Sequence, residues 1–486
     1  MIGSLQSKII QLTSEQLISF LTNKIAQLES NYSALQDKVE LLTQREVISN
    51  QRIEVLEKEN ENLREELSRY KIKKDSSNSS MPPSSDMNNP IRNKSLREKS
   101  GKKAGGQHGH KGKTLEFRKD PDEVIEHIPK TCDQCGIILI DTQNELIESR
   151  QVFDIPPIKV ICTEHRIFSN RCNCGHINCG VFPITVKSMV QYGCNMEATI
   201  AYMHTRQFMP YDRMREYFEC VMNLEISTGG INHILQRFVS KCKPIYDALK
   251  VKVEAATNLG CDETGAKVNK EKGWFWTWQN KFFTYIAFSS SRGFDTIESL
   301  FKNGLLNAIL NHDCWAAQFK CKAKGHQVCT SHLLRDLVFL FELYNNDWAI
   351  KFKELIKEAI ELKNILKPSD YINPIPQRDK LERRLTRLLK QEIPKKCQKL
   401  ITFQNRGLKY RDSILLFLYY EEVPPDNNGS ERAIRNIKVK QKVSGQFRSE
   451  KGASDFAILR SIVDTTIKSG KEVFGELLNI ANLTTE

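Results

Sequence analysis

The sequence predicts a multidomain protein of the α+β class, and three observations support this prediction. A heptad repeat near the N-terminus is typical of a coiled coil. Two pairs of cysteines that follow it are typical of a small metal-binding unit. Farther along, helical patterns surround a segment of strand-like patterns, which indicates a mixed sheet covered by helices. At 486 residues, the chain is long enough for roughly two to four such units.

Residues 14–72 are expected to form a coiled coil, because a heptad repeat runs through residues 17–70. The two seam positions of the repeat hold, in order, Leu21, Leu28, Leu35, Leu42, Leu56 and Leu63, and Ile25, Tyr32, Val39, Ile53, Asn60 and Leu67. No apolar partner segment lies nearby, so pairing between chains is favoured over a single helix that packs on its own domain. Asn60 would fix the register of the paired helices at some cost in stability. We therefore expect a homo-oligomer.

Residues 73–119 are predicted to be a linker. The first part is rich in Ser, Asn and Pro and cannot bury a core. The second part is basic and glycine-rich, and closely spaced glycines would let the backbone approach a phosphate strand. The candidate DNA-binding lysines here are Lys102, Lys103, Lys111 and Lys113. A solvated tether is the alternative, and the residue order excludes a nucleotide-binding P-loop.

Residues 120–185 contain a Cys-x-x-Cys pair, Cys132 and Cys135, and a Cys-x-Cys pair, Cys172 and Cys174. Two thiolates on a tight turn can hold one tetrahedral metal, and a second pair can complete its coordination. We therefore predict a structural Zn²⁺ site with these four ligands. The fourth ligand remains open, since His176 and Cys179 are substitutes, and free thiols are the alternative for the whole group.

Residues 187–250 are predicted to be helical, because large apolar residues recur on one face. Ser227 or Thr228 would cap a helix that begins there. Apolar positions of this kind more often form a simple core than a surface that contacts DNA.

Strand patterns mark residues 255–330. The runs Trp274–Trp278 and Phe282–Phe288 are aromatic and β-branched and are separated by a short polar turn, which predicts a hairpin. A helix over Phe294–Leu306 and a further strand over Ala308–His312 should follow. The order of these elements is that of an RNase H-like sheet.

Three acidic residues are prominent because of their local settings. Asp262 and Asp313 end short apolar runs, and Glu431 opens a basic helix over residues 429–442. Two carboxylates at strand ends and a third on a packing helix can hold two divalent metals about 3.5–4 Å apart, as in nucleases and polymerases. Mg²⁺ or Mn²⁺ is expected, because both accept oxygen ligands. Sequence spacing leaves two neighbouring acids as alternatives, Glu263 and Asp426.

The third acid is separated from the second by a charged, mostly helical stretch, residues 331–422. This stretch would be a helical insertion, and residues 423–486 would complete the core. At its start, His332 and Arg335 share one helical face and could point at the scissile phosphate, although a buried structural histidine is equally consistent with the pattern. Beside Glu431, the basic run favours contacts with DNA phosphates over a solvated face. Its candidate residues are Arg432, Arg435, Lys438 and Arg448.

Composition bounds the partners and the compartment. The formal net charge of +13 favours a polyanionic partner such as DNA, and a merely basic surface is the alternative. No apolar run approaches the roughly 18–20 residues of a membrane span, so no membrane association is expected. The sequence starts without a secretory leader, and its 14 cysteines suit metal ligands and free thiols better than disulfides. A cytoplasmic protein is therefore expected.

Several of these phrases resemble the IS66 family of bacterial transposases, from about residue 14 to the C-terminus. The most specific is Asp426-Asn-Asn-Gly-Ser-Glu431-Arg432, followed by Gly445-Gln-Phe-Arg448-Ser-Glu-Lys-Gly452-Ala453. The resemblance implies an RNase H-like core with a helical insertion, a helix-turn-helix-like region at 187–250 and a catalytic Asp-Asp-Glu (DDE) triad at the three acids. The chain departs from the family with Cys-x-Cys in the second cysteine pair and with Asp313-Cys-Trp where Asp-Gly-Tyr is usual.

The implied activity is DNA transposition. Such an enzyme binds the terminal inverted repeats of an inserted element, cleaves its 3′ ends and transfers them to target DNA with a divalent metal. Its partners would be the element ends and the target DNA, and small accessory proteins of the element can be further partners. Two alternatives remain, a catalytically silent DNA-binding protein derived from a transposase and another RNase H-like metal nuclease.

Overall fold

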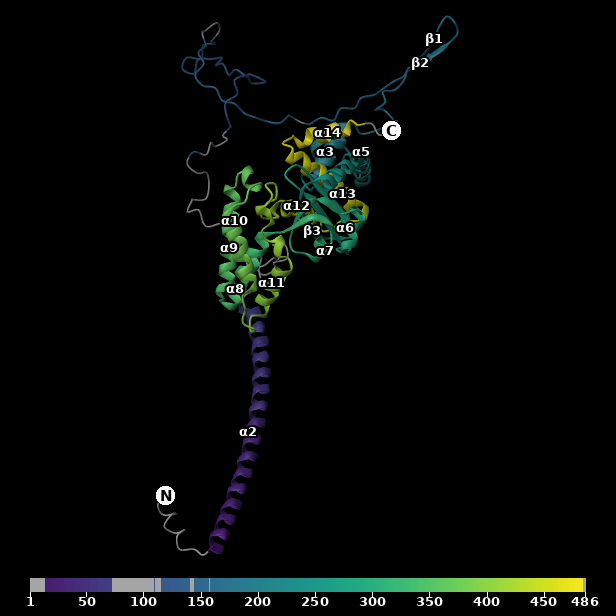
Figure 1. The fold of residues 1–486 in the computed structure, drawn as a ribbon. Coiled ribbons are helices and arrows are strands. Elements are labelled where there is room, and N and C mark those ends of the chain that lie inside the picture. Colours follow the sequence, from purple (N-terminus) through teal and green to yellow (C-terminus); the bar gives the residue numbers. More distant parts are fainter. Residues whose placement is uncertain (1–13, 72–108, 110–114, 140–143, 157, 484–486) are drawn as a thin grey trace.

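The computed structural model describes residues 14–71, 109, 115–139, 144–156 and 158–483 (Figure 1). A globular part holds the sheet and most helices. One long helix, α2 (Ser14–Lys71), projects from it as a rod. An extended segment carries the short ribbon of β1 (Ser169–Arg171) and β2 (Ile177–Cys179) away from the globular part. The structure is thus of the mixed α and β class.

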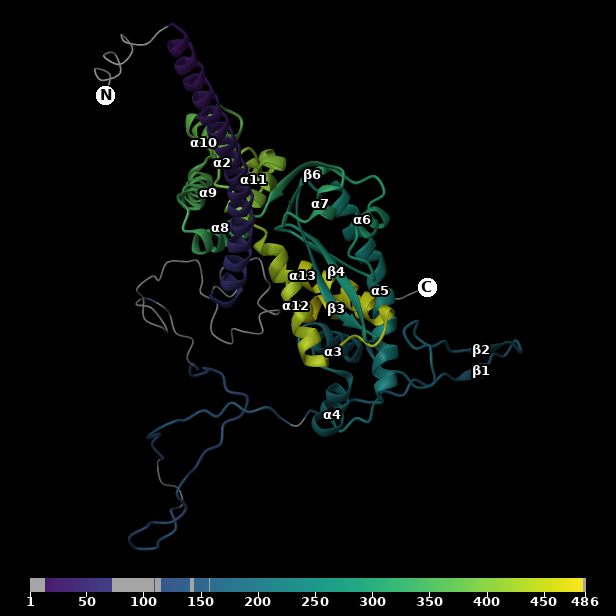
Figure 2. The ribbon, with the colours of Figure 1, turned by 90° about the horizontal axis from the view of Figure 1, so that it is seen from below.

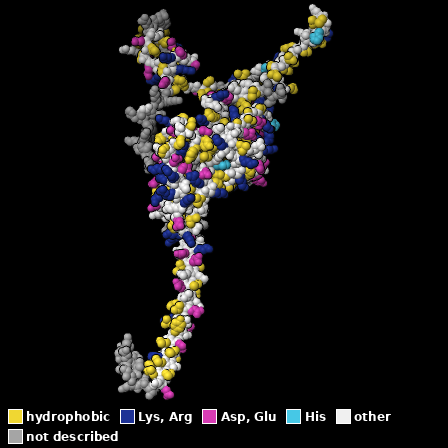
Figure 3. All heavy atoms as spheres, viewed as in Figure 1, with side chains coloured by type: hydrophobic (Ala, Val, Ile, Leu, Met, Phe, Trp, Pro, Cys, Tyr) yellow, Lys and Arg dark blue, Asp and Glu magenta, His cyan; other side chains and the backbone are white. Residues whose placement is uncertain are grey.

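Helix α2 leaves its apolar seam uncovered in the single chain. Leu28 and Leu35 are each 64% exposed, and Figure 3 shows hydrophobic side chains along the rod. Among the side chains described in this helix, only Leu17 and Glu61 are partly buried. The predicted helix is present, and its seam lacks a partner in the described part of the chain.

The globular part is built on a five-stranded sheet in the order β5-β4-β3-β6-β7. Strands β3, β6 and β7 are parallel to one another, and β4 and β5 continue the sheet in antiparallel fashion. The predicted hairpin is confirmed by the pairing of β4 with β5. The strands are β3 (Asn258–Val268), β4 (Glu271–Gln279), β5 (Thr284–Ser289), β6 (Leu305–His312) and β7 (Ala323–Val328).

Two details of this region differ from the sequence-based expectation. Helix α6 (Phe294–Leu300) is shorter than predicted, because the chain turns at Gly304, where φ is +77° and a Cβ atom would lie 2.5 Å from Lys322 O. Beyond β6, the chain forms a short helix, α7 (Ala316–Phe319), and the parallel strand β7, neither of which was predicted. The sequence Ala-Lys-Gly-His-Gln-Val of β7 lacks the β-branched alternation that marks a strand.

Helices cover both faces of the sheet. Leu249 and Val253 of α5 (Thr228–Ala255) pack with α6 on one face, against Trp276 and Trp278 of β4. Ile437 of α12 (Asn428–Ser444) packs on the other face with α13 (Glu450–Lys468). The first half of α5 forms a further core with α13 and three helices, α3 (Cys194–Thr205), α4 (Tyr211–Met222) and α14 (Val473–Ala481). The region at 187–250 therefore shares its core with the C-terminal helices.

Along the chain, a group of helices separates the second acid from the third. In space, this group lies to one side of the sheet (Figures 1 and 2) and contacts β7. Their buried core includes Phe352, Leu385 and Leu400 and continues into the sheet through Ile309 and Val328. The elements are α8 (Thr330–Tyr344), α9 (Asp347–Ile365), α10 (Pro376–Lys390), α11 (Gln398–Lys409), and the 3-10 turns η2 (Pro368–Tyr371), η3 (Arg411–Ser413) and η4 (Leu416–Leu418).

A buried set of hydrogen bonds, here called the amide clamp, ties residues 424–427 to the sheet. Asn311 Nδ2 of β6 donates to Pro424 O at 2.7 Å and to Asp426 O at 2.9 Å. Asn427 Nδ2 donates to Cys261 O of β3 at 2.7 Å. The two asparagines that form the amide clamp are 0% and 1% exposed. Because buried polar backbone must be paired, these bonds fix where the chain returns to the sheet.

In the described residues, no helix is both long enough and apolar enough to cross a membrane.

We predict that Asn311→Ala lowers the free energy of unfolding by about 1–3 kcal/mol, because the carbonyl groups of Pro424 and Asp426 lose their donor and the buried amide is removed. Chemical denaturation monitored by circular dichroism measures this change. Asn307→Ala, an exposed position on the same strand, is the matched control and should change stability little. Equal stability of the two variants would contradict the role given to Asn311.

Candidate active site

Asp262 and Asp313 lie next to each other just past the point where the parallel pairing of β3 with β6 ends. Asp313 follows the last residue of β6, but β3 continues to Val268, so Asp262 lies within its strand and not at the strand end where it was predicted. Gly260 of β3 pairs with Asn311 of β6, and two further residues on each strand lead to the two acids. Side chains alternate between the faces of a strand, so Cys261 joins the core under α5 and Asp262 faces α12. The register of the sheet therefore brings together two acids that are distant in the sequence.

Glu431 lies in the first turn of α12, which approaches the sheet closely because glycines line the contact. A Cβ atom at Gly260 would be 2.7 Å from Ser430 Oγ, and one at Gly429 would be 2.5 Å from Gln279 Nε2. An added side chain at either position would have to displace the side chains that fill this contact, so glycine favours the close approach of the helix to β3 and β4. This approach places Glu431 beside the strand ends.

His332 and Arg335 connect the second and third acids from the start of α8. His332 Nδ1 lies 3.0 Å from Asp313 Oδ1, and His332 Nε2 lies 3.9 Å from Glu431 Oε1. Arg335 Nη2 lies 3.2 Å from Glu431 Oε1 and 3.0 Å from His332 Nε2. The side chains of His332 and Arg335 are only 12% and 14% exposed. The structure therefore connects Asp313 and Glu431 through His332 and Arg335, and Asp262 lies close enough to Asp313 to affect its ionisation.

The electrostatics of this cluster favour a bound cation. Burial, followed by the nearby carboxylates of Asp313 and Glu263, raises the pKa of Asp262 well above its usual range. Burial lowers the pKa of His332, but its contacts with Asp313 and Cys329 outweigh burial and leave that pKa well above its usual range. Crowded, buried carboxylates resist ionisation unless positive charge lies close to them.

A divalent metal fits the donor atoms of this cluster. The carboxylate oxygens of Asp262, Asp313 and Glu431 are the ligand type that Mg²⁺ and Mn²⁺ accept. Asp313 Oδ1 lies 3.0 Å from His332 Nδ1 and pairs with this imidazole when the ring is protonated. A metal bound here would therefore compete with His332 for this oxygen.

A second donor set overlaps the first. Asp313, Cys329 and His332 each offer one ligand atom, and these atoms lie within 4.8 Å of one another. Such a mixed oxygen, sulfur and nitrogen set suits a softer metal such as Zn²⁺. The thiol of Cys329 is buried, however, and its sulfur accepts a hydrogen bond from Asn427 N at 3.2 Å. We therefore assign Cys329 to fixing the amide clamp rather than to metal binding.

The two alternative acids are occupied elsewhere. Glu263 points away from Asp262, because neighbouring residues face opposite sides of β3, and its carboxylate accepts from Arg292 at 2.8 Å. Asp426 Oδ1 accepts from Asn428 N at 3.0 Å at the start of α12. Glu263 remains close enough to raise the pKa of Asp262, but its carboxylate is engaged with Arg292, and that of Asp426 caps the start of α12.

The predicted basic residues differ in their availability to DNA. Arg432, Arg435 and Arg448 are exposed. Lys438 is partly buried and donates to Gly265 O, so this ammonium group already has a partner within the fold. Lys440, in the same helix, is buried, and burial lowers its pKa to about 8. The helix thus presents only part of its positive charge to solvent. The lysines predicted in the linker lie outside the described residues: Lys102, Lys103, Lys111 and Lys113.

The two cysteine pairs are each shaped as a tight turn, but the structure does not bring the pairs together. Gly136 N donates to Cys132 O, and Gly175 N donates to Cys172 O, each at 2.8 Å. Backbone and side-chain hydrogen bonds at Cys135 and Cys174 lower the pKa of Cys132 and of Cys172, respectively. Each pair therefore resembles half of a zinc site. Because zinc binding and folding are coupled in such units, the metal would supply the energy that joins the halves.

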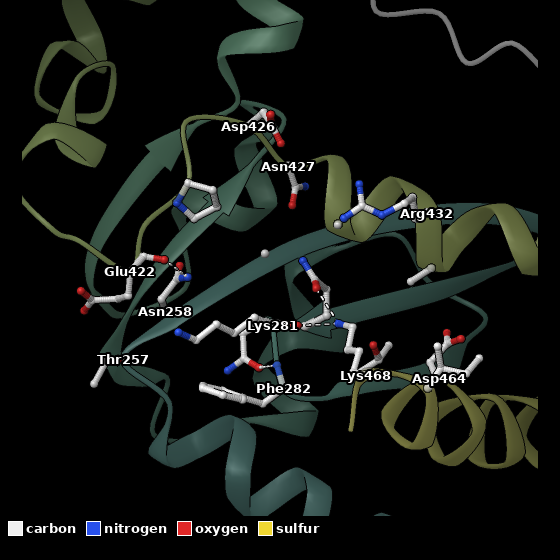
Figure 4. Close-up of a pocket in the computed structure, with 18 of the residues that line it drawn as sticks. Thr257, Asn258, Lys281, Phe282, Glu422, Asp426, Asn427, Arg432, Asp464 and Lys468 are labelled. Carbon is white, nitrogen blue, oxygen red and sulfur yellow. Dashed lines mark hydrogen bonds between the residues drawn. The ribbon is translucent and has the colours of Figure 1, made fainter. Parts of the chain in front are cut away.

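A cavity of 570 Å³ lies on another side of α12 and is not lined by the three acids (Figure 4). Lys468 Nζ donates there to Gln279 Oε1 at 2.7 Å and to Phe283 O at 3.0 Å, and burial lowers the pKa of Lys468 to about 8. The cavity wall also carries Asp426 and Arg432. Its lining mixes acids, amides and cations, which does not indicate metal chemistry.

Sequence reasoning missed the residues that position the acids. Gly260, Asn311 and Asn427 carry no charge and no recognisable motif of their own, although Asn427 lies inside the phrase that contains Glu431. The left-handed backbone at Cys314, with φ of +51°, was also missed. The usual glycine at this position in the resembling family was the available signal, since glycine adopts that conformation without strain.

Comparison with known proteins identifies the segments independently. Among proteins with curated descriptions, none matches this sequence. Residues 8–116 match the model of a family of unknown function (DUF6444). Residues 129–175 match the zinc-finger binding domain of transposase IS66, a range that contains all four predicted cysteine ligands and ends just before His176.

The longest match covers the helices and the sheet described above. Residues 189–455 match the model of the transposase IS66 family, which is more than half of the 486-residue chain. This range includes Asp262, Asp313 and Glu431 and the amide clamp that connects their supporting elements. The chain therefore belongs to the IS66 transposase family.

Proposed function

We propose that this transposase cleaves the 3′ ends of an inserted element and transfers them to target DNA with a DDE site formed by Asp262, Asp313 and Glu431. The observation that carries the proposal is the convergence of these carboxylates. His332 lies within 3.0 Å of the second acid and 3.9 Å of the third. Burial, together with repulsion from the second acid, raises the pKa of the first.

The sheet supports an RNase H-like assignment for the core. Three parallel strands and an antiparallel hairpin follow the order β5-β4-β3-β6-β7, with Asp262 within β3 and Asp313 directly after β6, both just past the end of the β3–β6 pairing. In open sheets, ligands bind at the carboxyl ends of parallel strands, where loops converge. After the helical insertion, the chain comes back to this part of the sheet, where the amide clamp holds it. Glu431 follows directly after the clamp.

The residues divide the chemistry among themselves. Asp262, Asp313 and Glu431 would hold Mg²⁺ or Mn²⁺, which supplies activation of a hydroxyl nucleophile and stabilises the leaving oxygen at phosphorus. His332 and Arg335 orient the second and third carboxylates and offer positive charge to the scissile phosphate. No covalent intermediate with the protein is required, since a water molecule or a 3′-hydroxyl group can attack directly.

DNA binding is assigned to several surfaces. The zinc-finger segment, with Zn²⁺ on Cys132, Cys135, Cys172 and Cys174, and the basic linker would contact DNA beside the catalytic core. Arg432, Arg435 and Arg448 extend the positive surface from the third acid. Exposed arginines on α12 and in the turn that follows it suit phosphate contacts, which position DNA without reading its sequence.

Assembly is assigned to the seam of α2. A contiguous row of large apolar side chains is rarely left in water by a monomeric protein, and here Leu21, Leu28, Leu35 and Leu42 are each at least 50% exposed. Pairing of two such helices would bury this surface and hold two catalytic cores in one complex. Small accessory proteins of the element would be additional partners.

We predict that Asp262→Asn reduces metal-dependent DNA cleavage by more than about 100-fold, since changes merely in the second layer around a metal typically cost 10–100-fold. Binding of element ends should remain. Cleavage of labelled end DNA and electrophoretic mobility shifts measure the two properties. Asp247→Asn, an exposed acid on α5, should behave as wild type. Full cleavage by the Asp262 variant would reject the site, and a wild-type chain that binds but never cleaves would indicate the catalytically silent alternative.

We predict that Leu28→Lys together with Leu35→Lys converts the full chain to a smaller species, because charged residues cannot be buried in the seam. Sedimentation velocity measures the mass of the complex. Gln27→Lys together with Ala34→Lys adds the same charge at the same spacing outside the two seam positions and should leave the mass unchanged. A wild-type chain that sediments as a monomer at high concentration would exclude assembly through α2.

We predict that Arg432→Ala together with Arg435→Ala weakens binding to all DNA sequences and makes its salt dependence shallower. Each lost phosphate contact changes the slope of log K against log salt by about 0.9, so the pair should change it by about 2. Fluorescence anisotropy over a salt series measures the slope. Lys351→Ala together with Lys357→Ala, two exposed lysines of α9, is the matched control. Unchanged slopes in the arginine variant would place the DNA on another surface.

A further inference from the structure

Cations and indole rings alternate along a surface next to the three acids. Lys272 Nζ lies 4.7 Å from the ring centre of Trp274. Arg292 Cζ lies 4.8 Å from that ring and 4.0 Å from the ring of Trp315. These four residues, here called the indole ladder, lead from the β3–β4 hairpin to the segment that follows Asp313.

Arg292, the central cation of the indole ladder, is held in place by the buried side chain of Glu263. Arg292 donates to Glu263 Oε1 through Nε at 3.1 Å and through Nη2 at 2.8 Å. The side chain of Glu263 is only 6% exposed, whereas that of Arg292 is 41% exposed. A two-point contact of this kind fixes the plane of the guanidinium group and offsets its charge. Arg292 is therefore a rigid support for Trp315.

Trp315 is unusually accessible for its size. The residue is 39% exposed despite its contact with Arg292, and it stands two positions after Asp313. Tryptophan is among the most buried residue types on average, because its large ring gains much from leaving water. The left-handed turn at Cys314, with φ of +51°, lies between the acid and the ring and is strained for a residue other than glycine. This geometry keeps an indole ring at the surface beside a candidate metal ligand.

The other end of the indole ladder approaches a turn that carries exposed lysines. Asn269 and Lys270 form the two-residue turn of the β3–β4 hairpin, both with positive φ. Glycine is favoured at the second position of such turns, yet here it holds a lysine. Lys267, Lys270 and Lys272 are exposed, and within the described residues none of them makes an ion pair. Positive charge followed by aromatic rings is the arrangement that binds single-stranded nucleic acid.

We propose that Trp315 stacks on an unpaired base of the DNA strand at the cleavage site, with Arg292 as its support. The proposal rests on the DDE function, because it places the unpaired base next to Asp313. A base inside a duplex has both faces covered by its neighbours and must leave the stack before a protein ring can contact it. Every base has an aromatic face, so the contact is expected to tolerate any sequence. Trp315 would thereby hold the frayed end of the element open.

The test compares two DNA probes with the full chain. One probe is a fully paired duplex, and the other is the same duplex with a few unpaired thymines at one 3′ end. Fluorescence anisotropy gives the dissociation constant of each without any cleavage step. The wild-type chain should prefer the probe with unpaired thymines. Trp315→Ala should lose roughly 10–100-fold in affinity for that probe and little for the paired one, and Trp315→Phe should restore most of the preference.

Two control variants separate this idea from the proposed function. Phe282→Ala removes an aromatic side chain that is 64% exposed elsewhere on the core and should keep the preference. Asp262→Asn should keep it as well, so an absence of metal-dependent cleavage would leave the stacking result standing. The proposal is overturned if the wild-type chain binds both probes equally, if Trp315→Ala retains the preference, or if Trp315→Ala weakens both probes alike while its thermal unfolding matches that of the wild type.

Discussion

The architecture of the site depends on the amide clamp. The second and third acids are separated by the whole helical insertion, whose core packs against Ile309 of β6 and Val328 of β7. The side-chain amides of Asn311 and Asn427 fix the position at which the chain returns to the sheet, because each donates to backbone carbonyls of a different segment inside the protein. Buried carbonyl groups that lacked these donors would be costly, so the return path is fixed. Gly260 then allows α12 to come close enough for Glu431 to reach the strand ends.

The acids and their neighbours form one electrostatic unit. Asp262 and Asp313 face the same side of the sheet, where burial and their mutual repulsion disfavour two anions. His332 and Arg335 contribute nearby positive charge from α8, but they contact the second and third acids rather than the first. A metal placed among the three carboxylates would offset the charge that these side chains leave uncompensated. His332 and Arg335 would then be close to an incoming phosphate.

Sequence reasoning located the acids but not the means of positioning them. Asp262, Asp313 and Glu431 were found from local patterns, namely apolar runs that end in an acid and a basic helix that begins with one. The role of Gly260 could not be found in this way, since it depends on which residues of α12 lie opposite β3. Strand β7 was missed because its sequence lacks the β-branched alternation of a strand, and its pairing with β6 and its contacts with the helical insertion are not visible in the local pattern. The basic run was overestimated, because helical periodicity turns Lys440 inward while a sequence count treats all of its lysines alike.

Both borders of the sheet are closed by the chain itself, and this has a consequence for how copies of the protein can meet. Along β5, the hydroxyl groups of Ser461 and Thr465 in α13 accept from Ile286 N and Thr284 N. Along β7, the side chain of Gln327 bonds to the backbone at Ile414 and Phe417. Strand edges that are covered by another segment in this way are poor templates for a strand from another molecule. The described sheet is therefore poorly suited to edge-to-edge aggregation, even at high protein concentration. Contacts between copies would form through side chains instead.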